Sequence, residues 1–135
     1  MSFLHRPRHE WLSADVIAAR SDVEQRLIDQ ILTAKVPPTI TEWKAGTDIF
    51  KQGFFAQAVH LILDGELSVK IDGSEVARLG SGSVVGEMAM LGNRQRTATV
   101  TALSPTTIAS KGEASDERDD LRALAVARGF NPPED

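Results

Sequence analysis

The strongest constraint on the fold is a series of short apolar–polar alternations across residues 39–110, separated by turn residues. Side chains that alternate with a period of two belong to strands with one buried face. Residues 67–71 (LSVKI) are a clear case, and the turn-forming pairs Asp64-Gly65 and Asp72-Gly73 on either side of them predict two tight hairpins. Short strands at a spacing of about 8–12 residues indicate an antiparallel sandwich, jelly roll or barrel.

Helical periodicity precedes this β region. Residues 13–34 place apolar side chains at a spacing of about 3.6 residues, which predicts two amphipathic helices. Ser13 or Asp15 could cap the first helix, and Ser21 or Asp22 could cap the second.

The two ends of the chain differ from the β region in composition. Residues 1–10 are rich in basic side chains and predict a frayed or loosely docked arm, whereas the sequence after Ser110 is acidic. A C-terminal helix is expected over residues 116–128, with an apolar face made by Leu121, Leu124, Ala125 and Val126.

We therefore divide the chain into an N-terminal arm with helices (1–38), a β region (39–110) and a C-terminal acidic segment with one helix (111–135). The fold class is mainly β with flanking helices, in the broad α+β class.

Composition and charge exclude several classes of function. The chain has no cysteine, which rules out disulfides, thiolate metal sites and a cysteine nucleophile, and its net charge of −4 argues against a nucleic-acid partner. No apolar run approaches a length of about 20 residues, which a membrane-spanning helix needs. The N-terminus lacks the apolar segment of a signal peptide. We expect a cytoplasmic protein with no membrane partner.

One segment inside the β region does not alternate. Gly86 to Leu91 (GEMAML) predicts a helical turn that begins at a glycine, and backbone amides at such a start can hold an anion. Arg96 can add a guanidinium fork to the same oxygens. Glu87 suits a neutral donor such as a sugar hydroxyl. Together these residues predict a site for a nucleotide with few phosphates.

The side chains give little support for an enzymatic function. His60 is the only histidine of the β region, so the cluster of histidine and carboxylate ligands in metal-dependent cupins is not predicted. No nucleophile–base pair can be assembled either. We expect no enzyme and no metal, with a structural role for His60.

Several motifs occur in the order typical of one family. Gly86 to Met90 (GEMAM) and Arg96 to Val100 (RTATV) resemble the phosphate-binding cassette of cyclic-nucleotide-binding domains. Residues 45–53 (AGTDIFKQG), 61–67 (LILDGEL) and 79–83 (LGSGS) resemble the motifs that precede the cassette in that family. The resemblance implies an antiparallel β-roll, or jelly roll, with a short internal phosphate-binding helix.

The resemblance also implies roles for individual residues. Arg96 would pair with the cyclic phosphate, Glu87 would accept from the ribose 2′-hydroxyl, and Thr97 would lie beside the phosphate and purine. The remaining ligand-binding positions would be Gly86, Met88, Ala89 and Ala98, through backbone amides, with Val76 and Met88 lining the purine pocket. The expected ligand is cAMP. Thr97 leaves cGMP open, because family members with threonine there take either base.

The sequence departs from the family pattern at three places. Gln95 replaces a proline, Val85 replaces an aromatic residue, and the segment after Thr107 differs from the usual last strand that runs into a long apolar helix. Two hypotheses follow. The chain is a cyclic-nucleotide sensor that repositions its helices toward a protein partner or in a homodimer, or it is a β-roll interaction module that has lost nucleotide binding.

Overall fold

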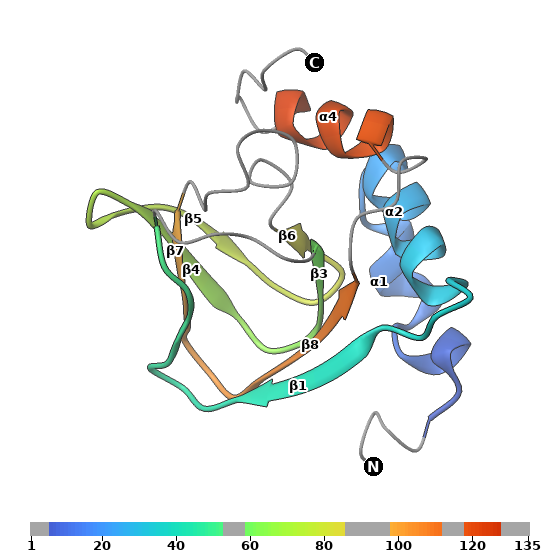
Figure 1. Ribbon diagram of the computed structural model, residues 1–135, viewed down its shortest axis with the longest axis horizontal. Helices are drawn as coiled ribbons and strands as arrows, with labels where there is room; N and C mark the ends of the chain where they lie inside the picture. The colour runs from blue at the N-terminus through green and yellow to red at the C-terminus, as the bar shows by residue number, and fades with distance from the viewer. Residues whose placement is uncertain (1–5, 53–58, 86–97, 112–117, 128–135) are drawn as a thin grey trace.

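The computed structural model describes residues 6–52, 59–85, 98–111 and 118–127, which form a β-roll with helices along one side (Figure 1). The helix-side sheet has the strand order β1-β8-β3-β6, formed by β1 (Thr39–Trp43), β8 (Thr106–Lys111), β3 (Val59–Asp64) and β6 (Val84–Val85). The far sheet has the order β2-β7-β4-β5, formed by β2 (Asp48–Phe50), β7 (Thr99–Ala102), β4 (Leu67–Ile71) and β5 (Ser74–Leu79). Every strand pair is antiparallel, which confirms the predicted fold class.

The described helices are η2 (Arg8–Glu10), α1 (Ala14–Ala18), α2 (Asp22–Leu32) and α4 (Arg118–Ala127). Helices α1 and α2 begin where the capping residues predict. Ser13 Oγ accepts from the Val16 amide at 3.2 Å, and Ser21 Oγ accepts from the Glu24 amide at 3.3 Å. The two serines are therefore the N-caps, and the alternative caps Asp15 and Asp22 lie in the first turns. No helix in the described ranges is long and apolar enough to cross a membrane.

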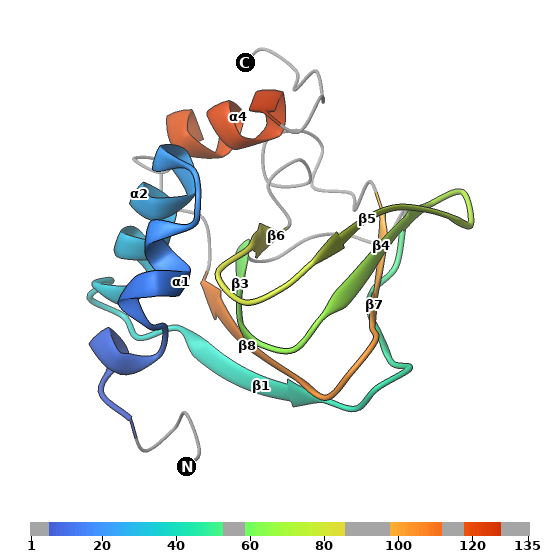
Figure 2. The same cartoon turned by 180° about the vertical axis from the view of Figure 1, so that it is seen from behind.

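Two apolar cores hold these layers together. The helix core lies between the helices and the helix-side sheet, and the roll core lies between the two sheets. Both views show these layers (Figures 1 and 2). Strand β3 serves both cores, because Val59, Leu61 and Leu63 face the helix core while Ile62 faces the roll core. This division follows from the alternation of side chains along residues 59–63.

One of the two predicted hairpins is wrong. At Asp64-Gly65 the chain crosses from the helix-side sheet to the far sheet, since β3 pairs with β6 and β8 whereas β4 pairs with β5 and β7. Gly65 has a φ of +105°, and a Cβ there would lie 2.5 Å from Thr106 Oγ1. Asp72-Gly73, in contrast, is a two-residue hairpin with φ of +51° and +83°, as predicted.

Three smaller expectations also need correction. The arm is docked from Arg6 onward, because the Arg8 guanidinium donates to the Ala34 carbonyl at 2.7 Å and Trp11, 7% exposed, joins the helix core. Strand β8 ends at Lys111, one residue past the predicted β region, and lies between β1 and β3. Val126, expected on the apolar face of the last helix, is 59% exposed.

Candidate functional site

The roll has one end that is closed by its own connections. The chain passes between the two sheets there four times, through residues 44–47, 64–66, 80–83 and 103–105. Backbone bonds tie these crossings together: the Leu103 amide donates to the Glu66 carbonyl at 2.8 Å, and the Gly46 amide donates to the Ala102 carbonyl at 2.7 Å. The other end is crossed by two further connections, residues 51–58 from β2 to β3 and residues 86–98 from β6 to β7.

The opposite end carries the residues next to the predicted cassette. Val85, the last residue of β6, pairs with His60 of β3, and His60 pairs with Ser110 of β8. Phe50, the last residue of β2, contacts His60 across the roll with ring centroids 4.4 Å apart. We call this end of the roll, defined by Phe50, His60, Val85, Ala98 and Ser110, the cassette end.

Most of the predicted site residues lie outside the described ranges. These are Gly86, Glu87, Met88, Ala89, Arg96 and Thr97, together with the predicted internal helix. Their place in the chain is nevertheless informative, because segment 86–97 follows β6 in the helix-side sheet and precedes β7 in the far sheet. The segment therefore joins the two sheets at the cassette end.

The two described site residues lie on the far sheet. Ala98 is half-buried and directly precedes β7. Val76 is the extra residue of a β-bulge in β5, because Val69 pairs with Ala77 while the next residue of β4, Lys70, pairs with Glu75. Val76 is 55% exposed. An exposed apolar side chain on a bulged strand is available to contact a planar base.

Strand β5 is held to β4 by a polar cluster. The buried Ser68 hydroxyl donates to Glu75 Oε2 at 2.5 Å, and Arg78 Nε donates to Glu75 Oε1 at 2.8 Å. The Ser68 hydrogen bond, followed by the Arg78 contact, lowers the pKa of the Glu75 carboxyl. Glu75 in turn raises the pKa of the Arg78 guanidinium. These bonds support the strand that carries Val76.

A second polar cluster ties the helices to the strand that leads into the cassette. Arg20 Nη2 donates to Glu24 Oε2 at 3.0 Å and to Ser83 Oγ at 3.1 Å, and we call these three residues the Arg20 junction. Glu24 and Ser83 are only 6% and 1% exposed. At Gly82, with φ of +89°, a Cβ would lie 3.0 Å from Val16 Cγ1, so α1 approaches this segment closely.

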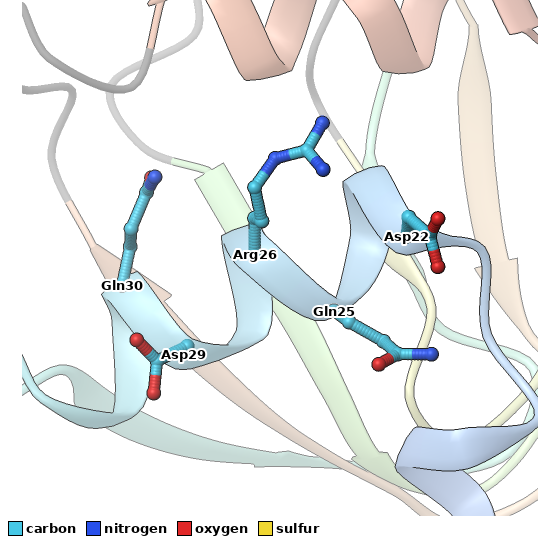
Figure 3. Close-up of a pocket in the computed structure, with 5 residues that line it drawn as sticks. All are labelled: Asp22, Gln25, Arg26, Asp29 and Gln30. Atoms are coloured by element: carbon cyan, nitrogen blue, oxygen red, sulfur yellow. The ribbon is translucent and has the colours of Figure 1, made fainter.

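Other places in the structure fit a nucleotide less well. A surface hollow of about 520 Å³ on α2 is lined by polar side chains of that one helix, Asp22, Gln25, Arg26, Asp29 and Gln30 (Figure 3). A purine site needs an apolar wall, which these residues do not offer. Within the described ranges, no cluster of histidine and carboxylate side chains could hold a metal ion.

The sequence predicted some functional positions and missed others. Alternation along β3 is enough to put His60 on the same strand face as Ile62, but its position at the cassette end depends on the pairing with Val85. The Arg20 junction had no sequence signal, because Arg20 and Ser83 are 63 residues apart. The alternation of side chains in the sequence did not predict the bulge at Val76 either.

Comparison with known proteins gives a consistent result. The sequence model of one family, described as "Cyclic nucleotide-binding domain", matches residues 40–114. A cAMP-dependent protein kinase regulatory subunit of Debaryomyces hansenii is 32% identical over 90 residues, which cover 67% of this chain and 19% of that protein. A cGMP-dependent protein kinase of Plasmodium berghei is 37% identical over 71 residues, covering 53% and 8% respectively. The chain thus spans less than a fifth of either relative.

Solved structures share the fold at lower identity. The regulatory subunit of a cAMP-independent protein kinase A from Trypanosoma brucei has a TM-score of 0.68 at 20% identity, covering 94% of this chain and 47% of that one. A structure from Geobacter metallireducens described as a putative cyclic nucleotide-binding protein has a TM-score of 0.64 at 17% identity, covering 92% and 98%. The regulatory domain of Toxoplasma gondii protein kinase A, crystallised with cAMP, has a TM-score of 0.54 at 26% identity, covering 81% and 39%.

Proposed function

The chain belongs to the cyclic nucleotide-binding domain family, and we propose that it is a cytoplasmic sensor that binds a cyclic nucleotide, in the first place cAMP, at the cassette end of the roll. The observation that carries this proposal is the connection from β6 to β7. It carries the cassette motif, and it joins the two sheets at the cassette end, beside Val85 and Ala98.

The chemistry of the cassette residues suits a ribose with a cyclic phosphate. We assign the singly charged phosphate to Arg96 and to the backbone amides near Gly86 and Ala98, because charge-assisted bonds to a fixed guanidinium fork are strong and directional. We assign the ribose hydroxyl to Glu87, since an ionised carboxylate accepts hydrogen bonds but repels a phosphate. The exposed Val76 is the apolar surface for the base.

Signalling would pass through the helices to a protein partner or a second copy. Helix α2 supplies Leu27 and Ile28 to the helix core and α4 supplies Leu124, so the two helices share one apolar layer with β3 and β6. A ligand shifts such an arrangement only by binding one state more tightly than the other. The role is regulatory rather than catalytic.

One comparison favours a second candidate function, a β-roll interaction module that binds no nucleotide. The Trypanosoma brucei structure, which has a TM-score of 0.68, is described as part of a cAMP-independent kinase, so this fold occurs in proteins with different ligand requirements. Glu87 and Arg96, both present in this chain, favour the sensor.

Calorimetric titration with cAMP and cGMP separates the two candidates. We expect saturable binding to the wild type. Arg96→Ala should weaken binding by at least about 2–5 kcal/mol, the cost of removing one partner from a buried charge pair. Lys35→Ala is the control, because Lys35 is a solvent-exposed cation outside the roll and should leave the affinity unchanged. Absence of heat with both nucleotides would favour the interaction module, and equal binding by Arg96→Ala would refute the role of Arg96.

A further inference from the structure

His60 faces the interior of the roll. It lies two residues before Ile62 on β3, and Ile62 is fully buried in the roll core. Its ring contacts Phe50 of the far sheet at 4.4 Å between centroids, with 37° between the ring planes. Its Nδ1 lies 2.6 Å from Ser110 Oγ. His60 is therefore a half-buried ionisable group between the two sheets.

The same residue lies beside both attachment points of the predicted cassette. Val85, its Cα partner on β6, is bonded to Gly86, the first cassette residue. Phe50, its ring partner, pairs with Val100 of β7, the last residue of the cassette motif. An anion bound at the cassette end, beside Val85 and Phe50, would therefore lie near the imidazole.

We propose that His60 is an affinity-determining residue of the nucleotide site, whose imidazole takes up a proton from solvent when the anionic ligand binds. The proposal rests on the proposed function. Histidine has an ordinary pKa of about 6.5, so a nearby anion changes its protonation in the physiological range. The Ser110 hydroxyl can accept from Nδ1–H, so its contact is compatible with the imidazolium.

The other charged groups near His60 do not by themselves cause it to take up a proton when the ligand binds. In the described part of the neighbouring strands, the ionisable groups are Lys111 on β8 and Asp48 and Lys51 at the two ends of β2, whereas β6 carries none. Lys111 pairs with Val59, whose side chain lies in the helix core, so Lys111 belongs to the opposite face of the sheet. These groups, and Arg96 and Glu87 of the cassette, are present with and without ligand. Only the nucleotide's charge changes on binding.

Calorimetry with cAMP from about pH 5.5 to about pH 8 tests the proposal, because this range brackets the ordinary pKa of histidine. The phosphate stays singly charged and the adenine neutral over this range, so any change in affinity comes from the protein. Affinity of the wild type should rise between about threefold and about thirtyfold as the pH falls, which corresponds to a rise of about 0.5–1.5 units in the pKa of His60. Buffers of different ionisation enthalpy should report proton uptake.

His60→Gln should retain binding at the high-pH affinity of the wild type and lose the pH dependence. His9→Gln is the matched control, because the His9 side chain is 79% exposed on η2, and it should keep the wild-type profile. NMR titration of the His60 ring with and without cAMP gives a second reading that does not depend on any variant folding.

The outcomes are distinct. Binding that is independent of pH, or an unchanged pKa of His60 on adding cAMP, overturns the role of His60 and leaves the sensor intact. Absence of binding by the folded wild type at every pH overturns both the sensor and the role of His60.

Discussion

The Arg20 junction yields a quantitative prediction about stability. Arg20→Gln removes the cation that faces the Glu24 carboxylate at 3.0 Å, and the Glu24 side chain is only 8% exposed. Removing one partner of a buried ion pair costs about 3–5 kcal/mol, because the remaining charge stays away from water. The Arg20 side chain is 26% exposed, however, so solvent already screens part of the pair. We therefore expect a loss of about 2–3 kcal/mol in the free energy of unfolding.

Denaturant unfolding followed by tryptophan fluorescence measures this loss directly. The chain has two tryptophans, and Trp11 is 7% exposed in the same helix core that contains α2. A double-mutant cycle with Glu24→Gln separates the pair's interaction energy from the separate effects of each substitution. Arg78→Gln serves as the control, because it breaks an ion pair with Glu75 of similar length, 2.8 Å, whose arginine is 62% exposed. It should leave stability unchanged.

Two results would refute this reasoning. One is a loss below about 1 kcal/mol for Arg20→Gln, which is the range of solvent-exposed pairs and would mean that water reaches Glu24. The other is a coupling energy near zero in the cycle, which would mean that Arg20 acts through its aliphatic stem rather than through its charge.

Two further predictions concern the closed end and β5. Gly65→Ala should lower the free energy of unfolding by about 2–4 kcal/mol in denaturant unfolding, because the new Cβ meets Thr106 Oγ1 at 2.5 Å. Gly73→Ala has a similar positive φ but nothing within 4 Å, so it should cost only about 1–2 kcal/mol. Equal losses would contradict the steric argument. Ser68→Ala should raise the pKa of Glu75 toward its ordinary value, as measured by carboxyl NMR. The lowered pKa of Glu75 stabilises the folded state at pH values above the pKa that this carboxyl has in the unfolded chain. The difference in unfolding free energy between the wild type and Ser68→Ala should therefore vanish as the pH falls through the folded-state pKa of Glu75. An unchanged pKa in Ser68→Ala would contradict the role given to the Ser68 hydrogen bond.

Local patterns predicted the elements well but not their partners. The period-two alternation located the strands, and the serine caps located the helix starts, because both signals depend on residues close in sequence. Asp64-Gly65 misled because a turn signal does not say whether the flanking strands pair with each other or belong to different sheets. The burial of Trp11 had no local signal for a similar reason: it depends on α2 and the helix-side sheet, which are remote in the chain.

The candidate site shows the same difference between residues that local sequence predicts and residues whose position depends on long-range contacts. The cassette residues follow from motif order within a short stretch, and they stay predictions because Gly86 to Thr97 lie outside the described ranges. The position of His60 at the cassette end, by contrast, depends on three strand pairings and a ring contact across the roll. Such long-range relations leave no periodic trace in a single sequence.

The segment before the cassette is held from two sides, and this arrangement gives the helices a physical route to the site. Toward the helices, Ser83 bonds to Arg20 at 3.1 Å. Toward the sheet, the Ile62 amide donates to the Ser83 carbonyl at 2.9 Å, and the Gly82 amide donates to the Ile62 carbonyl at 2.8 Å. Any movement of α2 away from the sheet must break the first contact or pull on the other two. Under the proposed function, a ligand that stabilises one position of Val84 and Val85 would also change the free energy of docking α1 and α2, and the same coupling would act in the opposite direction.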